Sequence, residues 1–153
     1  MIAALLDKVF APTPPWASLL ATAIRVASGA IFLGFGASKF AHHTREARAF
    51  ARYGLPDPGT FTYATGTLEV TLGAALVLGL LTRPAALGLA GNMIGAIATG
   101  GRVDGGFVNL ALAPILLAAM LFLVYAGAGR WSVDSLLRPW AVRWALQRRL
   151  ALR

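Results

Sequence analysis

The chain has 153 residues, of which 58% are hydrophobic and 13% are charged, whereas soluble domains carry about 25% charged residues, so the composition indicates a membrane protein. It contains no cysteine, which excludes disulfides, thiolate metal sites and thiol redox chemistry within this chain. Half of its basic residues flank apolar stretches or lie in the tail, so the net charge of +8 indicates anionic lipid headgroups rather than nucleic acid as a partner.

The first long apolar stretch predicts a membrane helix over residues 16–40. Its apolar run is longer than the core of a signal peptide, so we expect a permanent span. Arg25 and Lys39 lie within it, on one stripe of the helix together with Gly29 and Gly36. Each of the two cations either extends to the headgroups or finds a buried partner.

The first connection, residues 42–60, predicts a short interfacial helix from Thr44 to Tyr53, because arginines and aromatic side chains are mixed there. His42 and Glu46 are four residues apart, as two metal ligands on a helix would be. No third ligand is evident nearby, so we expect no metal site.

The second span, residues 61–81, carries a single acid, Glu69. A carboxylate at that depth must face a protein interior, find a partner or stay protonated. Gly66 and Gly73 share its face of the helix, and glycines allow close contact between membrane helices. Glu69 therefore points into a helix bundle, and either cation of the first helix is within reach of it.

A third helix is predicted over residues 84–99, which is slightly short for a span. Gly91 and Gly95 form a GxxxG pair, which is typical of a tightly packed membrane helix. Asn92 is the only amide side chain in this stretch. We expect it to form a hydrogen bond to another helix rather than to contact a ligand.

The remaining chain predicts a flexible loop over residues 100–106, in which Arg102 and Asp104 are solvated, and a fourth helix over 107–125. Pro114 is expected to bend this helix. A turn and a short helix capped by Ser132 then lead to a break at Arg138–Pro139.

These elements predict an all-α protein, a transmembrane four-helix bundle with a short interfacial helix in the first loop and a basic C-terminal interfacial tail. The expected units are an N-terminal segment (1–15), a membrane domain (16–137) and the tail (138–153). Four spans place both termini on one side, and the basic excess there favours the cytoplasm of a bacterial cell.

Several motifs, taken in order, resemble the DoxX family of small four-helix membrane proteins. They are IRVASGAIFLGFGASKF (24–40), FARYGLPDP (50–58), GTLEVTLGAALVLGLLTRPAAL (66–87) and GAGRWSVDSLL (127–137). The family often has a histidine where Phe35 stands in this chain. The resemblance covers residues 25–137 and implies the four-helix fold.

The family takes its name from a subunit of a thiosulfate:quinone oxidoreductase, and other members are associated with membrane oxidoreductase complexes. The resemblance therefore implies a membrane subunit that binds a quinone or docks a soluble or membrane redox protein. A quinone carbonyl needs a donor in an apolar cavity. Glu69, Arg25, Lys39 and Asn92 are the candidate polar site for it.

Two alternatives stay open. In the first, the bundle is a membrane anchor or scaffold without chemistry of its own, and Glu69 and its cation stabilise helix packing. In the second, it is a small transporter. The chain lacks cysteines, intramembrane haem-ligand histidines and a nucleotide motif, so catalysis by the chain alone is not expected. Assembly into a homo-oligomer fits each of these readings.

Overall fold

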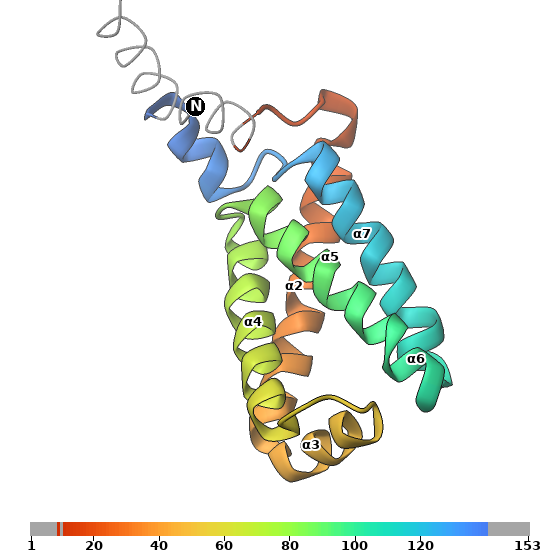
Figure 1. Cartoon of the computed structure of the whole chain (residues 1–153). Coiled ribbons are helices and arrows are strands. Elements are labelled where there is room, and N and C mark those ends of the chain that lie inside the picture. Colours follow the sequence, from red (N-terminus) through yellow and green to blue (C-terminus); the bar gives the residue numbers. More distant parts are fainter. Residues whose placement is uncertain (1–8, 10, 141–153) are drawn as a thin grey trace, which may run out of the picture.

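The computed structural model describes residue 9 and residues 11–140, and every regular element within that part of the chain is a helix. The long helices are α2 (Ser18–Ala41), α4 (Pro58–Leu78), α5 (Thr82–Ala98) and α7 (Ala113–Ala126), and their arrangement can be followed in Figure 1. Shorter elements connect or precede them: η1 (Pro15–Ala17), α3 (His43–Arg52), α6 (Gly100–Val103) and the π-helical η2 (Val108–Leu112). The all-α class predicted from the sequence is thereby confirmed for the described residues.

Three helical stretches are long and apolar enough to cross a membrane. They are Pro15–Ala41, Pro58–Leu78 and Val108–Ala126. α5 has 17 residues, which corresponds to about 26 Å of helix and falls short of a hydrocarbon core of about 30 Å. The described chain therefore contains three candidate spans and one shorter apolar helix that packs among them.

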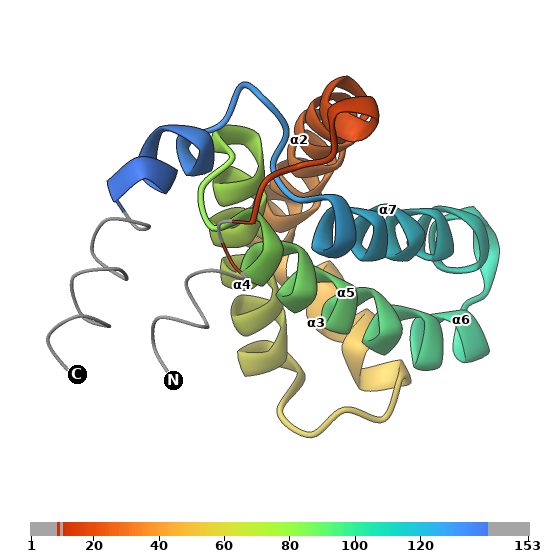
Figure 2. The ribbon, with the colours of Figure 1, turned by 90° about the horizontal axis from the view of Figure 1, so that it is seen from above.

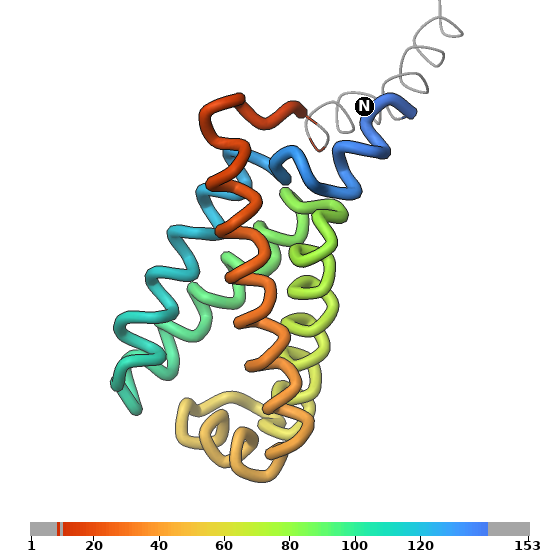
Figure 3. The backbone as a smooth tube through the Cα atoms, turned by 180° about the vertical axis from the view of Figure 1, so that it is seen from behind, coloured from red at the N-terminus to blue at the C-terminus, as the bar shows by residue number. Residues whose placement is uncertain are grey.

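The long helices form two pairs, since α2 packs most extensively on α4 and α5 on α7. The pairs meet where α2 begins, α4 turns into α5 and α7 ends, here called the α4–α5 end. They diverge toward α3 and α6, here called the α3 end, as Figures 1 and 3 show. Seen from above in Figure 2, α5 and α7 are inclined to α2 and α4. The bundle is therefore wedge-shaped.

Glycines bring α2 and α4 into backbone contact at two levels. A Cβ atom added to Gly29 would lie 2.9 Å from the carbonyl oxygen of Gly73, and one added to Gly36 would lie 2.9 Å from that of Gly66. Neither position has room for a side chain, so the helix axes approach more closely than larger residues would permit.

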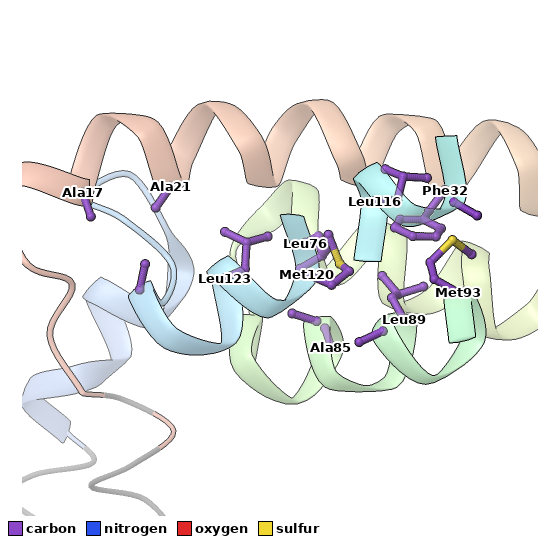
Figure 4. Close-up of a cluster of buried hydrophobic side chains, with 14 residues drawn as sticks. Ala17, Ala21, Phe32, Leu76, Ala85, Leu89, Met93, Leu116, Met120 and Leu123 are labelled. Atoms are coloured by element: carbon purple, nitrogen blue, oxygen red, sulfur yellow. The ribbon is translucent and has the colours of Figure 1, made fainter. Parts of the chain in front are cut away.

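The hydrophobic core fills the narrow part of the wedge. Leu76, Leu89, Met120 and Leu123 are fully buried, and they come from α4, α5 and α7 (Figure 4). Phe32 of α2 extends the same cluster toward the α3 end. This apolar layer closes the bundle interior between its two ends.

Local chemistry explains where α4 begins and ends. The side chain of Asp57 accepts a hydrogen bond from the amide of Thr60, and Pro58 occupies the first turn, where a missing N–H is harmless. Gly79 takes a left-handed conformation, with φ of 69°, and ends the helix. Consequently α4 starts three residues before the predicted residue 61 and ends three before residue 81.

Prolines later in the chain act in two ways. Just before Pro114 the amide of Ala113 donates to the carbonyl of Val108, five residues back, so the predicted bend takes the form of a wide π turn. Ser132 accepts a hydrogen bond from the amide of Ser135 and caps a helix from residue 133, as predicted. That helix reaches residue 140, so Pro139 does not break it; the tail beyond lies outside the described residues.

Candidate functional site

The acid of α4 lies inside the bundle and is bonded to two other helices. Glu69 is 3% exposed, and its Oε2 lies 2.6 Å from Nζ of Lys39 on α2. Its Oε1 accepts a hydrogen bond of 2.8 Å from Nδ2 of Asn92 on α5. We call these three residues the Glu69 cluster. The hydrogen bond predicted for Asn92 is present, and it joins α5 to the α2–α4 pair.

Helix direction explains why Lys39 is the partner. Side chains on an α-helix point toward its N-terminus. Lys39 lies near the end of α2 and therefore reaches back into the bundle, while Glu69 on the antiparallel α4 reaches toward the α3 end. The side chain of Arg25 starts higher on α2 and points away from Glu69, toward the α4–α5 end.

Arg25 is 2% exposed, and its side chain binds the C-terminal end of α4 instead. Its Nη1 donates to the carbonyl oxygens of Leu76 (2.6 Å) and Val77 (2.8 Å), and its Nη2 donates to that of Trp131 (2.6 Å). Carbonyls in the last turn of a helix have no partner within the helix and carry the negative end of its dipole. Arg25 therefore neutralises the α4 terminus and is remote from the Glu69 cluster.

A second acid, Asp134, holds the turn from α4 into α5. Its carboxylate accepts hydrogen bonds from the amides of Leu81 (2.7 Å) and Thr82 (2.9 Å), and its own amide donates to the carbonyl of Gly79 (2.9 Å). Leu81 has a left-handed backbone, with φ of 48°, which is unfavourable for a branched side chain. Asp134 thus caps the N-terminus of α5 from a distant segment, here called the Asp134 clamp.

The wide part of the wedge holds a cavity of about 740 Å³. The Glu69 cluster lines it on the inside, together with aromatic and aliphatic side chains from α2, α3, α4, α5 and α7. The apolar lining includes Phe32, Phe35, Phe50, Phe61, Met93 and Leu116. A buried polar cluster therefore faces a cavity whose wall combines these apolar side chains with further charged and polar ones. Polar groups that converge on a partly apolar cavity are found in many sites for small molecules.

Gly91 and Gly95 occupy a different place from the tightly packed contact that their spacing predicts. Both line the cavity, and a Cβ atom at either position would meet no described atom within 4 Å. The four glycines on α2 and α4 do lie at the close helix contact. The difference arises because α5 diverges from α4 at the level of Gly91 and Gly95.

An ion pair joins α3 to α6 beside the cavity. Arg52 donates to both carboxylate oxygens of Asp104, through Nη2 at 2.8 Å and Nε at 3.2 Å, and the hydroxyl of Tyr53 donates to Oδ2 at 2.7 Å. Burial and this hydrogen bond raise the pKa of Tyr53 to about 12. The bonds from Arg52 and Tyr53 lower the pKa of the Asp104 carboxyl. Asp104 is exposed to solvent, as expected, and in addition it is bonded to Arg52 and Tyr53.

Sequence reasoning missed the roles of Asp134, Tyr53 and Asp104 because each depends on a segment about 50 residues away. One signal was available for Asp134. It lies in the GAGRWSVDSLL motif, and two amides at the start of a helix need an acceptor. Within residues 9 and 11–140, no group of three His, Asp or Glu side chains is arranged to hold a metal ion.

The apolar spans, the enclosed ion pair and the cavity between the helix pairs define a small helical membrane protein with a polar cluster inside its bundle. The chain belongs to the DoxX family, whose model matches residues 20–102. It is 34% identical over 142 residues to the uncharacterized membrane protein Rv3486 of Mycobacterium tuberculosis, an alignment that covers 79% of this chain and 87% of the relative. No solved structure matches the chain significantly. The family predicted from the motifs is confirmed.

Proposed function

We propose that this DoxX-family protein binds a neutral carbonyl compound of the quinone class in its cavity, as a membrane subunit of an oxidoreductase assembly. The observation that carries the proposal is the Glu69 cluster facing a cavity with aromatic and aliphatic side chains in its wall. An ammonium group has three N–H donors and an amide nitrogen has two. Glu69 takes one from Lys39 and one from Asn92, so donors remain for a ligand carbonyl.

The charges around the cavity favour an uncharged ligand. Three cationic and three anionic side chains line it, namely Lys39, Arg45, Arg52, Glu46, Glu69 and Asp104. Two cation–anion pairs among them are direct ion pairs. At these two pairs a charged ligand would have to displace an existing partner, whereas a quinone head would not.

The membrane arrangement that accompanies this proposal has four crossings. α4 ends at the α4–α5 end, and the span Val108–Ala126 starts at the α3 end, so the short α5 must carry the chain back across. With an even number of crossings, both termini lie on one side, for which we propose the cytoplasmic side of a bacterial membrane. α3 then lies in the opposite interface.

Binding of decylubiquinone to the purified protein in mild detergent tests the proposal. We expect saturable binding at one site per chain, lost on Asn92→Leu, which removes a donor but leaves the Lys39–Glu69 pair in place. Arg102→Ala is the matched control, because Arg102 is exposed and does not line the cavity. Absence of saturable binding by the unaltered protein would contradict the proposed ligand.

A pull-down from native membranes tests the second half of the proposal. The tagged protein should carry a redox enzyme in near-stoichiometric amount together with quinone. A preparation that carries phospholipid alone would favour the anchor or scaffold function. That alternative has its own support, since both oxygens of Glu69 are already bonded and the cluster ties three helices together.

Transport through the bundle has less support. A transported polar solute would need a polar path beyond Glu69 toward the α4–α5 end. Fully buried apolar side chains, including Leu76, Leu89 and Leu123, fill that region. The cavity is therefore a chamber with a closed inner end in this structure.

A further inference from the structure

The contact between α4 and α5 changes along its length. A Cβ atom added to Gly88 would lie 2.7 Å from Cδ1 of Leu72, so the helices touch there. One and two turns closer to the α3 end, at Gly91 and Gly95, an added Cβ would meet no described atom within 4 Å. α5 thus separates from α4 as the two helices leave their common turn, which Figures 1 and 3 show for the backbone.

The separated faces line the cavity and also reach the molecular surface. Gly91 and Gly95 of α5 line the cavity and are exposed. On α4, Phe61 and Thr65 line it from the opposite side, and Phe61 is 38% exposed. Helical spacing puts these two α4 residues on the same side as Glu69. Residues that belong both to a cavity wall and to the surface mark an opening.

In the four-crossing arrangement proposed above, this opening faces the membrane. Phe61 and Thr65 belong to the span Pro58–Leu78, and Ile94, beside the two glycines on α5, is 56% exposed. An exposed isoleucine in a membrane helix faces acyl chains. The opening therefore leads sideways into hydrocarbon.

We propose that the gap bounded by Phe61, Thr65, Gly91 and Gly95, the α4–α5 window, is where the apolar tail of the ligand passes into the bilayer. The polar head lies at the Glu69 cluster, and the tail leaves the cavity between α4 and α5. This route restricts the class of ligand to molecules that dissolve in the membrane and carry a polar head and a flexible apolar tail. The nature of the head rests on the proposed ligand, whereas the window rests only on the four-crossing arrangement.

A tryptophan placed in the cavity tests the window. Phe35 lines the cavity from α2, and Phe35→Trp puts an indole there. The protein is reconstituted in phosphatidylglycerol vesicles whose acyl chains carry bromine at mid-chain, which quenches indole fluorescence on contact. The signal is the difference between chains with and without Phe35→Trp, which removes the contribution of the four native tryptophans.

We expect the added tryptophan to be quenched, because acyl chains enter the window. The double variant Gly91→Leu/Gly95→Leu should lose this quenching, and Phe61→Ala should increase it. Ala64→Leu is the control, since Ala64 is exposed on α4 but does not line the cavity. It should leave the quenching unchanged.

Three results would overturn the window: no quenching in the unaltered background, persistent quenching in the folded double variant, or no increase with Phe61→Ala. The quenching measured in Phe61→Ala also tests the window if the double variant does not fold. Acyl chains report on the window without any quinone. A failure of decylubiquinone to bind would therefore contradict the proposed function and leave the window result standing.

Discussion

At the scale of single residues, the Glu69 cluster shows how a membrane bundle accommodates an ion pair. The side chains of Lys39 and Glu69 are 12% and 5% exposed, so both charges are largely removed from solvent. Their attraction and the hydrogen bond from Asn92 offset that desolvation. Such a pair adds little net stability over an apolar pair, but loss of one member leaves a charge without its partner.

Loss of one charged partner should therefore cost more stability than loss of both. Glu69→Leu should lower the free energy of unfolding by about 3–5 kcal/mol, because Lys39 remains buried without its carboxylate. The double variant Lys39→Met/Glu69→Leu should recover most of the loss. Thermal unfolding in mild detergent measures both, with exposed Arg102→Ala as the control, for which we expect a change within about 0.5 kcal/mol. A double variant as unstable as Glu69→Leu would contradict the explanation.

The second prediction concerns Tyr53, whose phenol is partly buried and bonded to Asp104. Its pKa is raised from 10.0 to about 12. The folded chain thus keeps this proton to higher pH than the unfolded chain, so the contribution of Tyr53 to stability is lost as the pH rises from 10.0 to about 12. Asp104→Asn should move the pKa back toward 10.0, because the carboxylate acceptor favours the protonated phenol.

Ultraviolet absorbance of the phenolate against pH measures this shift. The tyrosine that titrates near pH 12 should be absent from Tyr53→Phe, which assigns it. It should titrate at lower pH in Asp104→Asn. An unchanged titration in Asp104→Asn would mean that burial alone raises the pKa.

The sequence was sufficient to place Glu69 in an interior but not to choose its cation. Distance along the helix axes makes Arg25 and Lys39 equal candidates. The direction of helical side chains separates them, since it sends Lys39 toward Glu69 and Arg25 toward the end of α4. That choice was within reach of sequence reasoning. The pairing of Arg52 with Asp104 was not, because it depends on how α3 meets α6.

At the scale of helices, α2 and α4 form the tightest contact of the bundle, and small residues permit it. Gly29 and Gly36 face Gly73 and Gly66, with the backbones in contact. Dispersion contacts between closely packed backbones are a main source of helix association in lipid. The Gly36–Gly66 level of this contact fixes the position of Lys39 relative to Glu69, because Gly36 lies three residues before Lys39 and Gly66 three residues before Glu69.

The third prediction compares two glycines of α2. Gly36→Leu should destabilise the protein by at least about 1–3 kcal/mol, because its Cβ would lie 2.9 Å from the carbonyl of Gly66. Gly34→Leu is the matched control: Gly34 is exposed, and an added Cβ meets no described atom within 4 Å. Thermal unfolding of the two variants in the same detergent checks the difference. Equal stability would show that α2 and α4 can separate without loss.

Helix ends were predicted less well than helix centres. Prolines and glycines marked the turns correctly, but the start of α4 depends on the cap by Asp57 and its end on the conformation of Gly79. The glycine-rich segment after α5 was expected to be a loop, and it contains the helical turn α6. There the amides of Arg102 and Val103 bond to the carbonyl of Thr99, so the chain compacts despite its glycines.

At the scale of the whole molecule, the two helix pairs are joined firmly at one end and separated at the other. The α4–α5 end contains the apolar core, Arg25 and the Asp134 clamp. At the α3 end the main polar link between α3 and α6 is the exposed pair of Arg52 and Asp104. Motion of one pair against the other is therefore expected to change the cavity more than the core.

The fourth prediction concerns membrane orientation. Four crossings assign the sequence positions of Lys8, Arg83 and the six arginines after Tyr125 to the side of the termini, so we expect that side to face the cytoplasm. A C-terminal green fluorescent protein should then be fluorescent in bacteria, and a C-terminal alkaline phosphatase should be inactive. Fusions placed after Arg102, on the opposite side, should give the reverse pattern. If fusions after Arg102 and at the C-terminus gave the same pattern, the span Val108–Ala126 would not cross the membrane between them.

The Asp134 clamp has a consequence for biosynthesis. The amides of Leu81 and Thr82 receive their acceptor from a residue that is synthesised 53 and 52 positions later. Arg25, made early, likewise reaches its third carbonyl only when Trp131 has emerged. Until then, the turn between α4 and α5 lacks this acceptor. These contacts at the α4–α5 end can therefore form only after the segment that follows α7 has been synthesised.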